Sequence, residues 1–469
     1  MSTPVPRRPA GVVCLVLAAL LAAGCERAPD FPLQTAAGRP PNVLLITIDS
    51  LRPDHLGAYG YPVPTSPAID GLAVAGVRFT QAIASAPETS PAVASLLTGL
   101  YQYRSRVLFN RGTLPPHLTT LAESARAAGY ATAGFAGNLL LAAQHGFDQG
   151  FAHFESFAKL KPGAAADDDG AKAALAWLDA APPAPWLLWI HFVHPHGPYV
   201  SADAAVSADF EYPPWVFGDD QPLIQGPSNV GLGVVPKYQQ VPGFTRPRDF
   251  IRRYDGEIRS TDTQVGRLLD ALDARGESDD TLVVLTADHG ESLLEHRELF
   301  QHGWFVYDTT LRVPLILSWP GVLPAGRVVE TQVSGVDLAP TLHQVLGLPT
   351  PGAQGPRPFD GASFGPLLFR DEPSADQRAV FAVGARQNHP FAVRWAGWKL
   401  IHTPAGRPPV PVPRFPPQGF DTPERFELYN LRTDPAELAN VAHKHPNVLQ
   451  AMQHYVTRFR QTFRKPAGG

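Results

Sequence analysis

Short runs of apolar, often β-branched residues alternate along this chain with longer segments of helical periodicity. The apolar runs occupy residues 42–48, 131–136, 186–193, 281–287 and 313–319, and helical patterns such as 118–129 and 249–276 lie between them. A continuous apolar run of this length is typical of a strand that is covered on both faces. Strands alternating with helices predict an α/β fold, with a doubly wound, mostly parallel sheet flanked by helices.

The composition fits one large α/β domain with an appendage. The 469 residues are 44% hydrophobic and 17% charged, so the chain can bury a substantial core. A formal net charge of −4 leaves no basic footprint for a polyanion. We therefore expect no nucleic-acid partner, and the sequence leaves the oligomeric state open.

The N-terminus has the pattern of a targeting segment. Basic residues precede an apolar run at 11–24, which is too short to span a bilayer and suits the core of a signal peptide. The run ends in LAAGC, which resembles the bacterial lipobox and implies cleavage before Cys25 and lipid attachment to its thiol. We interpret 1–24 as a lipoprotein signal peptide and 25–41 as a tether. An ordinary signal peptide with a coincidental cysteine is the alternative.

This interpretation predicts a protein of the bacterial cell envelope, lipid-anchored to a membrane and facing the periplasm. Several acyl chains attached at Cys25 would anchor it stably, whereas a single chain would not. Cys14 and Cys25 are the only cysteines of the chain, so we expect no disulfide in the mature domain. The choice between inner and outer membrane is left open.

Acidic and imidazole side chains follow several of the predicted strands at the point where each strand ends. Asp49 comes directly after the first run, and Asp288 with His289 comes directly after the fourth. In doubly wound sheets, sites gather beyond the carboxyl ends of the strands. Carboxylates combined with an imidazole suit zinc or manganese better than calcium, so we expect one such divalent ion here. A helix-capping role for the aspartates is the alternative.

The stretch APETSPAVASLLTGLY at 86–101 predicts a helix with a hydroxyl at its start. Thr89 or Ser90 is expected to cap this helix, with Pro91 at the first helical position. A hydroxyl there lies in the positive field of the helix N-terminus, which favours an anion. A nearby metal could turn this hydroxyl into a nucleophile. A plain capped helix is the alternative.

Ordered motifs from about residue 41 to 457 resemble the sulfatase family, within the alkaline-phosphatase superfamily. The matching segments are PNVLLITIDSLRPDHLGAYGY, TSPAVASLLTGLY, HPHGPY, LTADHGE, HGWFVYDTTLRVPLIL and FELYNLRTDPAELANVA. The resemblance implies a catalytic domain at 42–350 and a small α+β subdomain at 351–469. It also implies a metal-dependent hydrolase whose substrate is an anionic ester.

The nucleophile motif of that family, Cys-x-Pro-x-Arg, is changed at both ends. Thr89 stands where the cysteine that matures to formylglycine would be, and Val93 stands at the arginine position. Formylglycine is therefore excluded, and threonine resembles relatives that act on phosphorus, such as phosphoglycerol and phosphoethanolamine transferases. Ser50 and His289 replace a second carboxylate and an asparagine of calcium-type sulfatases, and both changes resemble the manganese- or zinc-type phosphonate monoester hydrolases.

The resemblance also implies roles for further side chains. His196 matches a histidine beside the leaving-group oxygen, where it could act as general acid. His302 falls near the family's second basic group, and Arg52 matches an arginine near the metal that would orient the nucleophile or hold a substrate oxygen. His194 stands at the family's aspartate position without an assigned role, and His55 is interpreted as structural.

The long segment 200–248 is rich in proline and aromatic residues and follows the histidine loop. Long ordered loops beside sites often form lids or specificity walls. Our hypothesis is that Tyr199, Tyr212 and Trp215 shape the substrate pocket. A plain surface loop is the alternative.

Together these features predict a lipid-anchored, metal-dependent hydrolase of phosphate, phosphonate or sulfate esters. Thr89 would be the nucleophile, and the metal would be held by Asp49, Thr89, Asp288 and His289. A threonine ester cannot collapse to an aldehyde as a formylglycine hydrate can, so water must attack the adduct, which favours phosphorus over sulfur. Two alternatives stay open: a transferase acting on envelope glycans or lipids, and a catalytically silent homologue that binds an anion.

Overall fold

The computed structural model describes residues 30–157, 166–200, 210–352, 358–370, 378–384, 390–405 and 424–463. The chain divides into two compact units, Met1–Asp30 and Phe31–Gly469, and the description below concerns the second. The predicted signal peptide and Cys25 lie outside the described residues. Within the described ranges, no helix combines the length and the apolar character that a membrane crossing requires.

A nine-stranded sheet forms the centre of the described structure, in the order β4-β3-β5-β1-β6-β7-β2-β8, with β9 paired to β2. Its strands are β1 (Asn42–Ile48), β2 (Val77–Ile83), β3 (Ala131–Ala136), β4 (His153–Ser156), β5 (Trp186–Phe192), β6 (Thr281–Ala287), β7 (Arg312–Ser318), β8 (Arg327–Val329) and β9 (Val333–Ser334). The stretch from β4 to β6 is parallel throughout. β7 runs antiparallel to both of its neighbours, so the sheet is mostly parallel, as predicted.

The continuous apolar runs of the sequence correspond to buried strands. Every residue of β1, β5 and β6 is buried, as expected for strands that are covered on both faces. Three predicted runs match their strands residue for residue, whereas 186–193 ends one residue late and 313–319 is shifted by one.

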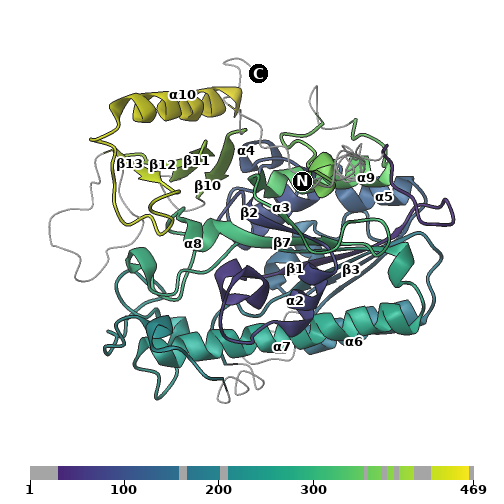
Figure 1. The fold of residues 1–469 in the computed structure, drawn as a ribbon, viewed down its shortest axis with the longest axis horizontal. Helices are drawn as coiled ribbons and strands as arrows, with labels where there is room; N and C mark the ends of the chain where they lie inside the picture. Colours follow the sequence, from purple (N-terminus) through teal and green to yellow (C-terminus); the bar gives the residue numbers. More distant parts are fainter. Residues whose placement is uncertain are drawn as a thin grey trace, which may run out of the picture. The chain divides into compact units, whose positions relative to one another are not determined.

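Helices cover both faces of this sheet (Figure 1). The helices are α2 (Pro67–Val74), α3 (Thr89–Thr98), α4 (Gln102–Ser105), α5 (Leu121–Ala127), α6 (Ala166–Asp179), α7 (Pro247–Ala274), α8 (Asp308–Leu311), α9 (Leu338–Leu346) and α10 (Pro446–Phe463). α2, α6 and α7 pack together on one face, and α3, α5 and α9 pack on the other. The predicted helix at 118–129 begins later, at Leu121, because Thr120 forms a capping box with Glu123.

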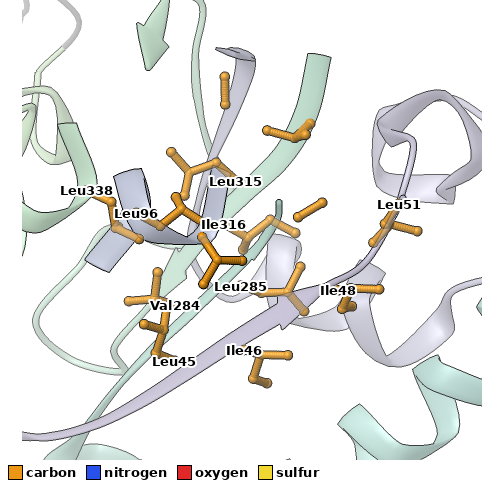
Figure 2. Close-up of a cluster of buried hydrophobic side chains, with 14 of the residues drawn as sticks. Leu45, Ile46, Ile48, Leu51, Leu96, Val284, Leu285, Leu315, Ile316 and Leu338 are labelled. Carbon is orange, nitrogen blue, oxygen red and sulfur yellow. The ribbon is translucent and has the colours of Figure 1, made fainter. Parts of the chain in front are cut away.

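The hydrophobic core lies between the sheet and these helices. Figure 2 shows leucine, isoleucine and valine side chains of β1, β6 and β7 beside Leu96 of α3 and Leu338 of α9. This packing fixes α3 against the sheet, with the N-terminus of the helix toward the carboxyl ends of the parallel strands. The position of that helix matters for the site described below.

A second, antiparallel sheet follows in the C-terminal part of the chain. It has the order β10 (Val380–Val383), β11 (Phe391–Trp395), β12 (Trp398–Thr403) and β13 (Arg425–Asn430), and α10 packs on it. Phe459 of α10 lies against Phe391, with ring centroids 5.0 Å apart. This α+β arrangement agrees with the predicted class of the C-terminal subdomain.

Candidate active site

The candidate site lies at the carboxyl edge of four adjacent parallel strands. Asp49 follows β1, Asp288 follows β6, and Asn138 lies just beyond β3. His191 is the penultimate residue of β5, between β3 and β1 in the sheet. Ser50 has a left-handed φ of 61°, which is uncommon for a residue with a side chain and turns the chain sharply after Asp49.

The Asp49 carboxylate is fully buried at the centre of this edge. Its Oδ1 accepts a hydrogen bond from Ser50 Oγ at 3.1 Å, and its Oδ2 accepts one from Asn138 Nδ2 at 2.6 Å. Two imidazole nitrogens face the same carboxylate: Nε2 of His289 lies 3.7 Å from Oδ1, and Nε2 of His191 lies 3.7 Å from Oδ2.

Asp288 presents one bonded and one unbonded oxygen. Its Oδ1 accepts from the backbone N–H groups of Ser50 at 3.1 Å and His289 at 2.7 Å. Its Oδ2 is buried without a hydrogen-bond partner among the described residues. Burial and the negative charge of Asp49 raise the pKa of Asp288 to about 8. A buried carboxylate oxygen of this kind needs a proton or a cation beside it.

His289 is held in the tautomer that can bind a cation. Its Nδ1 lies 2.8 Å from the carbonyl oxygen of Gly290, and since a carbonyl only accepts, Nδ1 carries the proton. Nε2 therefore has a free lone pair, which faces Asp288 Oδ2 at 3.5 Å. Burial lowers the pKa of His289, which keeps the ring neutral at neutral pH.

Thr89 brings a hydroxyl to His289 from the start of helix α3. It is the first residue of α3, is fully buried, and places Oγ1 3.4 Å from Nε2 of His289. The expectation that Thr89 or Ser90 caps the helix, with Pro91 at its first position, is wrong. The extended residue before the helix is Glu88, with φ −144° and ψ 145°, so Pro91 is the third helical residue. The Thr89 hydroxyl is thereby left to contact His289.

Ser90 points elsewhere. Its Oγ donates to the carbonyl oxygen of Leu140 at 3.4 Å, and its backbone N–H donates to Oδ1 of Asn110 at 2.9 Å. The two neighbouring hydroxyls are therefore distinguished by the first turn of α3, which directs only that of Thr89 toward His289.

The side chains at this edge fit a divalent cation. One nitrogen of His191 and one oxygen each of Asp49 and Asp288 lie within 4.8 Å of one another, and all three residues are buried. A mixed set of carboxylates and imidazoles is the donor set of zinc or manganese, whereas calcium takes oxygen alone. Sequence reasoning missed His191 and Asn138. The signal for His191 was a histidine in the otherwise apolar run 186–193.

Three imidazole rings lie next to one another in the order His289, His302 and His196. The ring of His302 lies 4.2 Å from that of His289 and 5.1 Å from that of His196, measured between centroids. His302 Nδ1 lies 3.0 Å from Oε1 of buried Glu291, a residue that sequence reasoning did not single out. Although burial opposes it, the charges of Asp49 and Glu291 raise the pKa of His196, which favours its protonated form.

The guanidinium of Arg52 contacts acidic side chains and a backbone carbonyl. Its guanidinium bonds both oxygens of Asp54, at 3.0 and 2.7 Å, Oε1 of Glu295 at 2.8 Å and the carbonyl oxygen of Glu291 at 3.1 Å. In this arrangement Arg52 braces the segment after His289, and its predicted contact with substrate stays a prediction.

The two remaining histidines of the sequence analysis have structural partners. His55 Nδ1 lies 2.7 Å from Oδ1 of Asp255, and His194 Nδ1 lies 2.9 Å from Oδ2 of Asp167. Both aspartates are buried, so each histidine serves as a local partner within the fold.

The segment predicted as a lid runs beside the loop that carries His302. Backbone hydrogen bonds join Gly233 to Arg297 at 2.6 Å and Leu299 to Gly231 at 2.7 Å. Tyr199 is buried in the core, whereas Trp215 has 68% of its surface exposed. Tyr212 packs on Phe217, and residues 201–209 lie outside the described part.

Comparison with known proteins places this architecture in a family. The chain matches the Sulfatase family over residues 41–348, more than half of its length. Residues 295–405 also match the N-sulphoglucosamine sulphohydrolase C-terminal family.

Individual relatives agree with that match. Mouse steryl-sulfatase is 29% identical over 88% of this chain and 77% of its own length. The Δ4,5-hexuronate-2-O-sulfatase of Bacteroides thetaiotaomicron is 27% identical over 90% of each protein. The structure of the phosphonate monoester hydrolase of Agrobacterium radiobacter superposes with a TM-score of 0.69 and 25% identity, covering 90% of this chain and 96% of that protein. The chain belongs to the sulfatase family, a family of ester hydrolases.

Proposed function

We propose that this chain is a metal-dependent hydrolase of phosphate, phosphonate or sulfate esters that uses Thr89 as its nucleophile. The observation that carries the proposal is the 3.4 Å separation between Thr89 Oγ1 and Nε2 of His289, beside the buried carboxylates of Asp49 and Asp288. The only cysteines of the chain, Cys14 and Cys25, precede the family match and cannot supply formylglycine to this site.

The chain's own residues supply a nucleophile, an anion site and an acid. Asp49, Asp288 and His289 would hold a divalent ion, and such an ion lowers the pKa of a hydroxyl beside it. Thr89 Oγ1 then loses its proton to solvent and forms a bond to phosphorus or sulfur, while the bond to the leaving-group oxygen breaks. The positive field at the start of α3 favours the anionic group that is attacked.

His196 is the group that we assign to the leaving oxygen. Its raised pKa favours the protonated ring, whose proton goes to the oxygen that departs. In the second half of the reaction water adds to the Thr89 ester, the bond to Oγ1 breaks, and His196 takes a proton back from the water. Oγ1 regains a proton from solvent, which restores the hydroxyl of Thr89.

We further propose that esters of phosphorus are preferred over sulfate esters. The Thr89 adduct has no route of release other than attack by water, because threonine lacks the second hydroxyl through which a formylglycine hydrate expels sulfate. Attack of water on phosphorus with electrostatic help from a metal and positioned donors is well attested. The relative named phosphonate monoester hydrolase supports this preference, whereas the two relatives named sulfatases support the broader class.

A substrate panel with one shared leaving group tests this function. Metal-free protein is reconstituted with zinc or manganese and assayed with the para-nitrophenyl esters of phosphate, phenylphosphonate and sulfate, and with the phosphodiester. We expect turnover of a phosphorus ester above that of the sulfate, and loss of every activity in His289→Ala. A sulfate ester as the best substrate would overturn the phosphorus preference. Equal activity of His289→Ala would overturn the metal-dependent mechanism.

A further inference from the structure

His191 is a buried histidine that neither the family motif nor the proposed mechanism uses. It lies opposite Thr47 in the pairing of β5 with β1, with its side chain fully buried. Its Nε2 has no hydrogen-bond partner among the described residues and lies 3.7 Å from Asp49 Oδ2. One ring nitrogen of His191 and one carboxylate oxygen each of Asp49 and Asp288 lie within 4.8 Å of one another.

The hydrogen bonds behind the ring indicate which nitrogen carries its proton. Thr47 Oγ1 contacts three groups: Trp189 Nε1 at 2.9 Å, His191 Nδ1 at 2.9 Å and the carbonyl oxygen of Ile190 at 3.4 Å. The indole can only donate and the carbonyl can only accept. If Nδ1 of His191 donates, the hydroxyl accepts two bonds, gives one, and satisfies all three contacts. The lone pair of the ring is then on Nε2.

That lone pair faces two carboxylates. In this tautomer Nε2 has no proton to offer to Asp49, and the free Oδ2 of Asp288 is close by without a partner. Nitrogen and carboxylate lone pairs repel one another in a buried site unless a cation lies between them. The arrangement is therefore one that a metal ion satisfies and that a hydrogen bond does not.

The spacing of the donor atoms is suitable for a single ion. Donors at ~2.1 Å from a tetrahedral zinc ion lie ~3.4 Å from one another. The separations here are 3.5 Å from His289 Nε2 to Asp288 Oδ2, and 3.7 Å from each histidine Nε2 to its oxygen of Asp49. Only small movements would bring these four side chains onto one ion.

We propose that His191 is a direct ligand of the metal, so that two aspartates and two histidines hold the ion and Thr89 approaches as a further donor. This inference rests on the metal site of the proposed function. Its consequence is selectivity: two imidazole ligands favour zinc and disfavour calcium, which takes oxygen ligands. Thr47 and Trp189 act as positioning residues that fix the tautomer of His191.

Metal binding measured without catalysis tests the proposal. Metal-free full-length protein is titrated with Zn²⁺ and Ca²⁺ as wild type, His191→Ala, His191→Gln and the control His117→Ala, whose histidine is exposed. We expect Zn²⁺ affinity to fall more than a hundredfold in both His191 variants, beyond the 10–100-fold that loss of an outer partner typically costs. The ratio of Zn²⁺ to Ca²⁺ affinity should fall with it, while His117→Ala matches wild type. Thermal unfolding of each variant checks that it still folds. His191→Gln keeps a polar side chain at this position, so weaker Zn²⁺ binding by the folded variant reports the loss of the imidazole.

Spectroscopy separates a ligand from a residue that only positions another. X-ray absorption of the zinc protein should count two imidazoles in wild type and one in His191→Ala. In His191→Cys loaded with Co²⁺, a thiolate-to-metal charge-transfer band should appear that Co²⁺-loaded wild type lacks, because only direct contact produces it. One imidazole in wild type, or unchanged Zn²⁺ affinity in His191→Ala, would overturn the proposal that His191 is a ligand. Either result would leave the proposed function standing. Wild type that binds no metal would overturn the proposed function as well.

Discussion

Thr89 and His289 are 200 positions apart in the sequence, yet Oγ1 of one lies 3.4 Å from Nε2 of the other. Two separate packing events produce this contact. Burial of α3 against the sheet fixes the position of Thr89, the first residue of the helix. The buried strand β6 ends just before Asp288 and His289 and fixes their position. Thr89 and His289 are thus both positioned by elements that pack in the buried core.

A buried ion cluster between α8 and the C-terminal sheet should contribute strongly to stability. Nζ of Lys399 is fully buried and lies 2.8 Å from Asp308 and 2.7 Å from Glu437. Removing the cation leaves buried Glu437 without its cationic partner, while Asp308 keeps Arg394 at 3.1 Å, so Lys399→Ala should lower the free energy of unfolding by about 3–5 kcal/mol. Urea unfolding measures the change.

The matched control for that variant is an exposed ion pair. Lys172 pairs with Asp168 on α6 with 59% of its side chain exposed, so Lys172→Ala should cost at most about 0.5 kcal/mol. An equal loss in free energy of unfolding for the two variants would contradict a strong contribution of the buried cluster to stability.

Asp262 should make stability depend on pH in the acidic range. Its carboxylate accepts from the backbone N–H groups of Ala68 and Ile69 at the start of α2, while burial raises its pKa to about 6. The folded state therefore binds its proton more tightly than the unfolded state, where the pKa is near 3.8. The stability that protonated Asp262 adds to the folded state is complete below pH ~4 and is lost as pH rises through ~6.

Asp262→Asn removes this titration and provides the measurement. Between pH ~4 and ~7 the stability of wild type should fall relative to the variant by up to about 3 kcal/mol, since one pKa unit corresponds to about 1.4 kcal/mol. Urea unfolding across this range reports the difference. A difference that stays constant with pH would mean that Asp262 is ionised throughout.

Much of the fold was predictable because the decisive signal is local. A continuous apolar run such as 281–287 is typical of a strand that is covered on both faces, so it located β6 to the residue. The start of α3 was not predictable, because the extended backbone of Glu88 and the contact of Thr89 with His289 are tertiary effects that override capping preference.

The site was predictable where polar residues follow a strand, and not where they lie within one. Asp49 and Asp288 stand out because they interrupt the pattern at a strand end. His191 was missed because a single histidine in an apolar run marks a polar position without identifying what it contacts, and its partner Thr47 comes from a different strand. Asn138 was missed because its contact with Asp49 depends on the order β3-β5-β1 in the sheet.

The proposed location in the cell envelope has a direct test in the two cysteines. Cys25→Ser should move the protein from the membrane fraction to the soluble fraction, or leave it uncleaved, because the predicted lipid is attached to that thiol. Cys14→Ser is the control, since Cys14 lies in the segment that would be removed. Membrane fractionation and mass spectrometry of the mature N-terminus read out the result. Wild-type fractionation and processing of Cys25→Ser would contradict the lipid anchor.

The most direct test of the central claim is the identity of the residue that becomes covalently modified during turnover. The reaction of the enzyme with a slowly hydrolysed phosphorus ester is quenched during turnover. The peptides of the enzyme are then sequenced by mass spectrometry. We predict a phosphoryl or phosphonyl group on Thr89 and turnover reduced by several orders of magnitude in Thr89→Ala, with fold and most metal binding retained. Ser90→Ala should lose far less, because its hydroxyl points to Leu140. An adduct on Ser90, or near-wild-type turnover in Thr89→Ala, would contradict the account.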